Sequence, residues 1–199
     1  MSTKARLVLV SVKTPFAFNP MRPETAVYDA LAGLLAYPRA GFHESAEDWI
    51  AVVTAANSQA GEKLVAFHEM LSSKSPSELE EHYARTFDNS ISGALETGWH
   101  VFGETYERGG FLVRMRQLCR ECGVVESGEL PDHLVHVLPV LGRTDESLAL
   151  ELVEEVAVPA VTKVCISLAA DENPYESVLD AVLVVLNQHV QNQNGCLSS

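Results

Sequence analysis

Two cysteines and two histidines stand close together in the middle of the chain, at Cys119, Cys122, His133 and His136. Two thiols separated by two residues and followed by two imidazoles form the kind of ligand set that holds Zn²⁺ in small structural sites. A Cys-x-x-Cys pair can also exchange a disulfide when it opens a helix after a strand. This segment is therefore the first candidate for metal or redox chemistry.

The surroundings of the two cysteines favour a plainer interpretation. Ten residues separate the Cys pair from the His pair, where a zinc finger usually has about twelve. Cys119 and Cys122 fall on the same side of an expected helix as Met115 and Leu118, and no strand precedes them. Free cysteine is among the most often buried residue types. We therefore expect buried structural thiols, with a metal-binding or thiol-redox protein using Cys119 and Cys122 as the alternative.

The rest of the chain lacks the motifs of the common hydrolytic and nucleotide-binding sites. It contains no Gly-x-Ser-x-Gly, no His-Glu-x-x-His, no Walker loop and no Gly-x-Gly-x-x-Gly after a strand. His43-Glu44 and His68-Glu69 stand alone, and we expect them on solvated surfaces. The sequence predicts no catalytic residue and no metal or cofactor held by the chain itself.

A second group of unusual residues lies between Tyr83 and Gly110. Aromatic side chains, carboxylates and glycines gather there without the regular spacing of a helix core. One interpretation is a groove with an apolar floor and an acidic rim, which binds an amphipathic basic helix. The other is that Tyr83 and Phe87 are ordinary core residues, and that Glu104 begins a helix whose dipole suits a negative charge.

The charge balance narrows the partners of such a groove. The 199 residues carry 14 Lys and Arg against 27 Asp and Glu, which gives a net charge of −13 and a pI near 4.9. A domain this acidic repels nucleic-acid phosphates, so we expect a basic protein or peptide partner and no nucleic acid. Four cysteines are too few for a secreted disulfide scaffold, and we interpret them as reduced thiols in a cytoplasm.

Helical periodicity runs through almost the whole chain from Glu24 onward. The strongest start signals are Ser75-Pro76-Ser77-Glu78 and Asn173-Pro174-Tyr175-Glu176, in which a cap, a proline and a glutamate follow one another. Ser45 is expected to cap a second helix, and Leu64, Phe67 and Leu71 to lie on a third. No strand alternation bounded by hairpin turns is present apart from the short run at residues 7–12.

The middle of the chain predicts one long helix and its neighbours. This helix is expected from about Glu104 to Cys122, with Gly123 as its C-terminal stop. Pro131 is expected to open another helix, and Thr144 or Asp145 a third that bends at Pro159. Residues 88–98 form the most loop-like interior stretch.

These elements predict an all-α protein, a single-domain helical bundle of about seven to nine helices. We expect residues 1–23 to form an N-terminal extension outside the core, residues 24–190 the helical domain, and residues 191–199 a disordered tail.

The first residues imitate the start of a signal peptide, because Lys4 and Arg6 precede an apolar run over residues 7–12. Lys13 ends this run, no small-x-small cleavage site follows, and a membrane-spanning helix needs about 20 apolar residues. We therefore expect neither export nor membrane insertion, and Met21 could be the true first residue.

Five motifs follow one another along the chain and together cover roughly residues 24–190. Each is weak alone, but the five in this order resemble the nitrate reductase delta-subunit (NarJ-type) chaperones, within the TorD/DmsD group of redox-enzyme maturation proteins. The motifs are Tyr28-Asp29-x-Leu31-Ala32-x-Leu34-Leu35-x-Tyr37-Pro38, Tyr83-x-x-x-Phe87-Asp88, His100-x-x-Gly103-Glu104-x-x-x-Arg108-Gly109, Gly128-Glu129-Leu130-Pro131-Asp132-His133-Leu134 and Asn173-Pro174-Tyr175.

The resemblance implies an all-helical, TorD-like cytoplasmic protein without catalytic activity. Such a protein binds the apo catalytic subunit of a molybdenum oxidoreductase, often through that subunit's N-terminal segment. It holds the subunit competent for insertion of molybdopterin guanine dinucleotide and iron–sulfur clusters, and prevents premature membrane docking or export. With Trp99 and Phe102 from the aromatic segment, the client-binding residues are then expected to be Tyr83, Phe87, Asp88, His100, Gly103, Glu104, Arg108, Gly109, Pro131, Asp132 and His133.

The identity of the client stays open. Residues 89–96 stand where nitrate reductase chaperones usually carry basic residues and then an aromatic run. The stretch from His100 to Gly109 looks more like chaperones of related periplasmic enzymes, such as selenate or chlorate reductases and ethylbenzene or dimethylsulfide dehydrogenases. The chain is expected to be a monomer or a homodimer.

Overall fold

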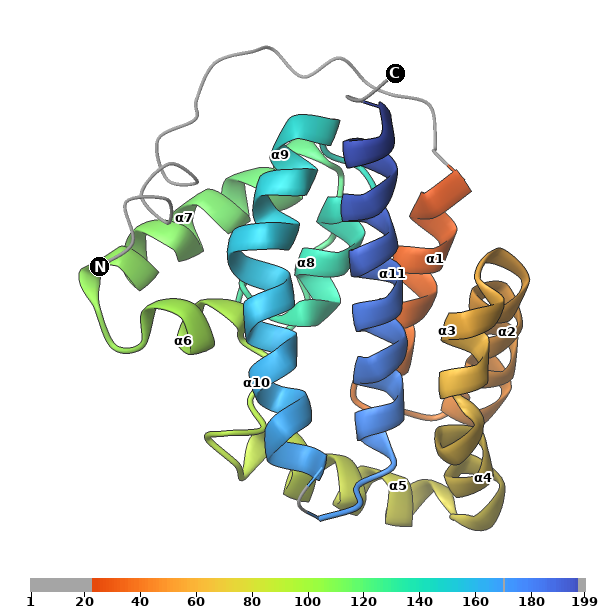
Figure 1. Ribbon diagram of the computed structural model, residues 1–199. Helices are drawn as coiled ribbons and strands as arrows, with labels where there is room; N and C mark the ends of the chain where they lie inside the picture. The colour runs from red at the N-terminus through yellow and green to blue at the C-terminus, as the bar shows by residue number, and fades with distance from the viewer. Residues whose placement is uncertain (1–22, 170, 197–199) are drawn as a thin grey trace.

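The structure, a computed structural model, describes residues 23–169 and 171–196 (Figure 1). These residues form eleven α-helices and two single π-helical turns, and they contain no strand beyond an isolated bridge between Glu96 and His133. The all-α class predicted from the helical periodicity is confirmed. No helix within the described ranges is both long enough and apolar enough to cross a membrane.

The helices are short, and most connections between them are tight. They are α1 (Pro23–Leu34), α2 (Phe42–Ala56), α3 (Ser58–Lys63), α4 (Val65–Ser73), α5 (Pro76–Tyr83), α6 (Thr97–Phe102), α7 (Tyr106–Glu121), α8 (Leu134–Leu141), α9 (Glu146–Leu152), α10 (Val158–Ala169) and α11 (Tyr175–Cys196), with π-helical turns η1 (Ala84–Asp88) and η2 (Val153–Ala157).

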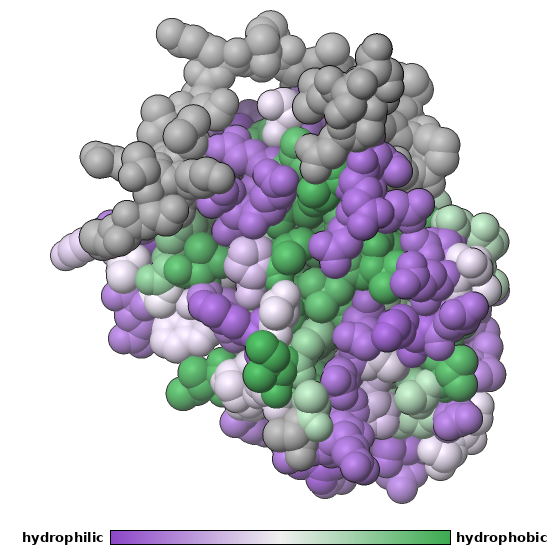
Figure 2. Space-filling model, viewed as in Figure 1, coloured by the Kyte–Doolittle hydropathy of each residue, from purple (hydrophilic) through white to green (hydrophobic). Residues whose placement is uncertain are grey.

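The long helix α11 lies at the centre of the bundle. It packs against α10 on one side and against α1 and α3 on the other, and α1 in turn packs on α2 and α8. Figure 1 shows α6 and α7 on one flank and α2, α3 and α4 on the opposite flank. In the same view, hydrophobic surface runs along the line between α11 and the neighbouring α9 and α10, with hydrophilic surface on both sides (Figure 2).

Helix starts follow the predicted caps closely. At α5, the Ser75 backbone N–H and hydroxyl both donate to Glu78 Oε2, at 2.9 and 2.6 Å. At α9, Asp145 Oδ1 accepts from the Leu148 N–H at 3.0 Å, and before α11 Asn173 Oδ1 accepts from the Tyr175 N–H at 3.1 Å. These caps satisfy backbone donors that a helix start leaves without an intrahelical partner.

Three predicted helix limits are wrong for local reasons. The second helix begins at Phe42, before Ser45, with Gly41 as its N-cap. Pro131 does not open a helix, because the chain is still extended at His133, whose ring nitrogen Nδ1 caps α8 by accepting from the Val135 N–H. The loop-like stretch over residues 88–98 ends early, since α6 begins at Thr97.

Interruptions inside predicted helices explain why the chain has more segments than the expected seven to nine. The helix expected around Leu64 is divided there into α3 and α4. The bend expected at Pro159 lies just before it, where the Val158 N–H reaches back five residues to the Val153 carbonyl and makes the turn η2. Proline cannot donate a backbone hydrogen bond, so an irregular turn at this place is physically reasonable.

The predictions for the two ends of the chain have different outcomes. α11 continues to Cys196, so residues 191–196 are helical where a disordered tail over 191–199 was expected. Glutamine and asparagine tolerate a helix once its earlier turns are held by buried side chains. Most of the expected extension over residues 1–23 lies outside the described residues, and Pro23 is the first residue of α1.

Candidate functional site

The cysteine and histidine segment is built into the core. Cys119 is fully buried, Cys122 is half-buried at the end of α7, and burial raises the pKa of both thiols to about 11. Thiols with such a pKa stay protonated at neutral pH and are poor nucleophiles. Within the described ranges, no three His, Cys, Asp or Glu side chains are grouped so that they could hold a metal ion. The prediction of buried thiols is confirmed for Cys119.

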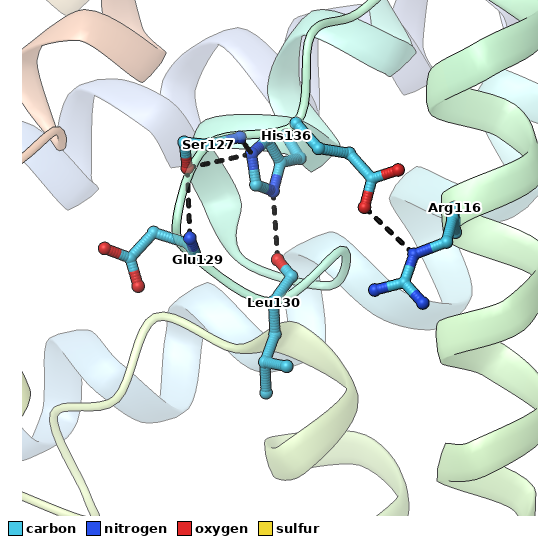
Figure 3. Close-up of polar contacts among 6 residues, drawn as sticks. Arg116, Ser127, Glu129, Leu130 and His136 are labelled. Atoms are coloured by element: carbon cyan, nitrogen blue, oxygen red, sulfur yellow. Dashed lines mark hydrogen bonds and ion pairs between the residues drawn. The ribbon is translucent and has the colours of Figure 1, made fainter.

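The two histidines form hydrogen bonds with backbone groups around the start of α8. Burial lowers the pKa of His133 to about 3, so its ring is neutral and Nδ1 can accept the cap hydrogen bond. His136 Nε2 accepts from the Ser127 N–H at 2.9 Å, so the proton is on Nδ1, which donates to the Leu130 carbonyl at 2.9 Å (Figure 3). His136 therefore clamps both ends of the turn over residues 127–130.

The clamped turn is also tied to the neighbouring helix. Arg116 on α7 pairs with Glu126 at 3.0 Å, and the Ser127 hydroxyl accepts from the Glu129 N–H at 3.2 Å (Figure 3). Both Glu129 and the 43 % exposed Leu130 stand on the surface. The result is a rigid turn that presents one carboxylate and one apolar side chain to solvent.

We expect the substitution His136→Ala to lower the free energy of unfolding by about 1–3 kcal/mol, because it leaves the Ser127 N–H without a partner and removes one of the two hydrogen bonds to the Leu130 carbonyl, which also accepts from the His133 N–H. Urea denaturation measures this loss, and hydrogen exchange should show faster exchange at Ser127. The matched control is Arg116→Gln, which removes only an exposed ion pair and should cost at most about 1 kcal/mol. Equal stability and equal Ser127 exchange in the two variants would contradict the clamp.

An aromatic cluster lies under the first predicted client-binding motif. The ring of Phe87 lies 4.9 Å from that of Tyr83 and 4.8 Å from that of Tyr175, in edge-to-face contacts. The Tyr83 hydroxyl donates to the Leu35 carbonyl at 3.0 Å. Tyr83 and Phe87 are 2 % and 4 % exposed. The interpretation of these two rings as core residues is confirmed, and neither ring is open to a partner in this conformation.

Carboxylates surround the place where this cluster reaches the surface. Tyr37, 37 % exposed, packs its ring 5.4 Å from that of Tyr83 and donates its hydroxyl to Glu80 at 3.4 Å. Burial raises the pKa of Tyr83 most, and the charges of Glu129, Asp88 and Glu96 raise it further. These carboxylates therefore act on one region. We name it the acidic patch and define it by Tyr37, Glu80, Asp88, Glu96, Glu129 and Leu130.

The negative charge of the acidic patch is compensated only in part, since Arg39 is close enough to Tyr37 to lower its pKa while Glu80 and Asp88 raise it. Asp88 is exposed at the end of η1, and partial burial raises the pKa of its carboxyl. Within the part of the chain that the structure describes, Asp88, Glu96 and Glu129 form no ion pair. A half-exposed aromatic ring with an excess of carboxylates around it is suited to bind a basic, partly apolar segment.

A second cluster joins α6, α7 and the loop before α8 through a buried carboxylate. Asp132 is fully buried, and its Oδ2 lies 3.3 Å from Arg108 Nε, while Oδ1 has no hydrogen-bond partner. Burial raises the pKa of Asp132, and the nearby Arg108 guanidinium opposes this shift. The guanidinium also lies 5.6 Å from the centre of the Trp99 ring. The Asp132 carbonyl accepts from the Thr97 N–H at 2.8 Å, which attaches the loop to α6.

Glycines at both ends of α6 permit this arrangement. A Cβ at Gly98 would lie 2.6 Å from Asp132 Oδ2 and 2.9 Å from Phe111, so a side chain there would displace the buried carboxylate. Gly103 ends α6 with φ 64° and ψ −152°, a conformation essentially limited to glycine. Phe102, just before it, packs its ring 5.3 Å from that of Phe111.

The remaining predicted residues, His100, Glu104, Gly109 and Pro131, belong to the same region. His100 Nε2 donates to the Ala94 carbonyl at 2.7 Å, which closes the loop before α6. Glu104 is exposed but does not begin the helix as expected, because Thr105 is the N-cap and α7 starts at Tyr106. Gly109 is exposed in the first turn of α7, whereas Pro131 is buried with its neighbours.

All thirteen predicted residues thus come from the end of α5, η1, α6, the connection into α7 and its first turn, and the loop before α8. The Glu96–His133 bridge and the hydrogen bond from the Leu134 N–H to the Leu95 carbonyl, 3.0 Å, join two of these segments. Of the residues that define the acidic patch, the prediction left out Tyr37, Glu129 and Leu130, although each stands inside one of the five motifs, as does Tyr175 beneath the patch. It also missed Glu80 and Glu96, for which the sequence holds no signal beyond their charge.

Comparison with known proteins shows the family of the chain. The chain is 29% identical over 161 residues to the probable nitrate reductase molybdenum cofactor assembly chaperone NarJ of Bacillus subtilis (strain 168), covering 80% of this chain and 87% of that protein. It is 26% identical over 163 residues to the nitrate reductase molybdenum cofactor assembly chaperone NarJ of Escherichia coli (strain K12), covering 80% of this chain and 69% of that protein. Residues 53–192, well over half of the chain, match the profile of the nitrate reductase delta subunit family, and the chain belongs to this family.

Proposed function

We propose that this chain is a cytoplasmic assembly chaperone for a molybdenum oxidoreductase of the nitrate reductase/DMSO reductase type. It binds the apo catalytic subunit and supports cofactor insertion before membrane docking or export. Membership of the delta subunit family and the names of its relatives support the chaperone role. The acidic patch is the observation that supports binding of a basic client segment.

The patch suits the N-terminal segment of a client better than a folded surface. Its apolar contacts are few, namely the half-exposed Tyr37 ring and Leu130, while its carboxylates are several. A narrow segment can place apolar side chains on Tyr37 and Leu130 and basic side chains toward Asp88 and Glu129. Charge complementarity of this kind raises the association rate and fixes orientation, and the apolar contacts slow dissociation.

The predicted client-binding residues then divide into two roles. Direct contact with the client is proposed for the exposed and half-exposed members, and the five buried members hold the surface in shape from beneath. The contact residues are Asp88, Trp99, His100, Phe102, Gly103, Glu104, Arg108 and Gly109, and the supporting residues are Tyr83, Phe87, Pro131, Asp132 and His133.

Purification of the tagged full chain from its native host, with mass spectrometry of the bound proteins, tests the partner. The proposal predicts a molybdopterin-binding catalytic subunit that contains little molybdenum. Recovery of the chain with no such subunit, under conditions in which the enzyme is made, would contradict the proposal.

We expect the double substitution Asp88→Lys and Glu129→Lys to weaken binding of a peptide that copies the client's N-terminal segment by about tenfold at low salt, and by less at high salt, because surface charges are screened. Isothermal titration calorimetry at two salt concentrations measures both effects. Glu62→Lys with Glu69→Lys makes the same change of charge at exposed positions on α3 and α4. If this control weakens binding equally, the effect is one of net charge and the patch assignment is wrong.

A further inference from the structure

A second acidic surface lies away from the acidic patch, along α9 and η2. Residues 145–155 contain five carboxylates and no Lys or Arg. Glu151, Glu154 and Glu155 form no ion pair with any described residue. Burial raises the pKa of Glu151, and repulsion from Glu155 and then Asp145 adds to the shift. A cationic segment lying here would relieve this repulsion.

Apolar side chains accompany these carboxylates where α9 meets α11. Glu146 Oε1 lies 3.3 Å from His189 Nε2, so the two helices are in contact at this point. Leu150 follows Glu146 by one turn on α9, Val190 is next to His189 on α11, and both are half-buried. In Figure 2 a hydrophobic strip with hydrophilic borders follows this junction. We name this surface the α9–α11 face and define it by Leu150, Glu151, Glu154, Glu155, Leu183 and Val190.

The start of α1 is attached beside this face. The Thr25 hydroxyl donates to the Gly142 carbonyl at 2.8 Å, three residues before Asp145, the N-cap of α9. The chain that precedes Pro23 therefore joins the described part next to the acidic stretch. Extended chain covers about 3.4 Å per residue, so the nine residues between Lys13 and Pro23 can span about 30 Å. The eleven residues 145–155 cover only about 17 Å as helix, so Lys13 can reach any part of the face.

The charge of that preceding segment is opposite to the charge of the rest of the chain. Residues 1–22 hold four basic residues, Lys4, Arg6, Lys13 and Arg22, and no Asp or Glu. The remaining residues hold 10 Lys and Arg against 27 Asp and Glu, a net charge of −17. The segment also carries the apolar run over residues 7–12. The basic and apolar blocks of residues 1–22 are therefore complementary to the α9–α11 face, where carboxylates border an apolar strip.

We propose that residues 1–22 bind in cis to the α9–α11 face. The basic side chains lie toward Glu151, Glu154 and Glu155, and the apolar run covers Leu150 and Val190. A tethered segment has an effective concentration in the millimolar range, so contacts with a dissociation constant below about 1 mM keep it mostly bound. A second copy of the chain is a poorer occupant, because two copies with net charge −13 repel each other.

Hydrogen exchange of the full chain, followed by mass spectrometry, tests the contact at the amides of residues 7–12. The unmodified chain should protect them, and Glu151→Lys with Glu154→Lys should speed their exchange by about tenfold, because the face then repels the segment. The matched control Glu62→Lys with Glu81→Lys changes the net charge equally at exposed positions on α3 and α5, and should leave the exchange unchanged.

A charge swap completes the test. Adding Arg6→Glu and Lys13→Glu to the variant with lysines at positions 151 and 154 restores the attraction with reversed signs, so protection of residues 7–12 should return. The proposal is overturned if these amides exchange at the unprotected rate in the unmodified chain, or if the face variant and its control behave alike. Protection that rises with protein concentration would also overturn it, because the face would then bind a second copy.

Discussion

Replacing Phe87 by alanine is expected to lower the free energy of unfolding by about 3–5 kcal/mol, the usual cost of removing a buried aromatic ring. Phe87 is 4 % exposed and packs against the rings of both Tyr83 and Tyr175. The surrounding rings come from α5 and α11, two helices held at many other points, so they cannot collapse fully into the space. Urea denaturation monitored by circular dichroism measures the loss.

The neighbouring residue provides the control for this prediction. Asp88 is exposed, so Asp88→Ala should change stability by no more than about 0.5 kcal/mol. This pair of variants also separates the two roles assigned to the motif, since Asp88→Ala should affect client binding without affecting the fold. If Phe87→Ala proves as stable as the parent chain, the ring is not part of the core and the burial described above is wrong.

Removing Arg108 should have an effect of similar size for a different reason. Asp132 is fully buried, and Arg108 is the cation beside its carboxylate. Breaking a buried ion pair from one side leaves an uncompensated charge, at a cost of about 3–5 kcal/mol. We therefore expect Arg108→Ala to be strongly destabilising. Adding Asp132→Asn should recover part of the loss, because the carboxylate that lost its partner is then neutral.

The pH dependence of the Arg108→Ala variant provides an independent check. Burial raises the pKa of Asp132 and Arg108 lowers it, so without Arg108 the pKa in the folded chain rises further. Between the unfolded pKa, near 3.9, and this raised value, the folded chain binds more protons than the unfolded chain, so its stability increases as pH falls.

The free energy of unfolding of Arg108→Ala should thus approach that of the parent chain as the pH is lowered toward 4. Denaturation at several pH values measures this trend. The double variant with Asp132→Asn lacks the titrating group and should not show it. A deficit that is constant with pH would mean that Asp132 is not the group left without a partner.

Much of the fold follows from short-range signals that the sequence carries openly. Helix caps are one such signal, because their side chains accept hydrogen bonds from backbone N–H groups at the start of a helix. Examples are Glu78, which accepts from the Ser75 N–H, and Asp145, which accepts from the Leu148 N–H. The failures lie where tertiary contacts decide. Pro131 is a good first residue for a helix, yet residues 131 and 132 form a turn and His133 is extended, because the Asp132 carbonyl accepts from the Thr97 N–H and His133 forms a bridge with Glu96.

The candidate site was predictable as a region but not in its detail. The motif around Phe87 gave the correct segment, and its spacing of four from Tyr83 was equally compatible with core and surface. The turn η1 decides between core and surface for Phe87. In this turn the Asn89 N–H donates to the carbonyl of Ala84, five residues earlier, which shifts the register of the helix. Residue propensities do not predict such a π-helical turn. The convergence of Glu80, Asp88, Glu96 and Glu129 is likewise a product of the tertiary fold.

The most direct test of the central claim is the molybdenum content of the client's catalytic subunit, purified from native host cells that lack this chain. The chaperone account predicts a subunit that is made but contains several-fold less molybdenum than in the parent strain. Returning the unmodified chain should restore the metal, and returning the variant with lysines at positions 88 and 129 should restore it only in part. A catalytic subunit with full molybdenum content in the absence of this chain would contradict the account.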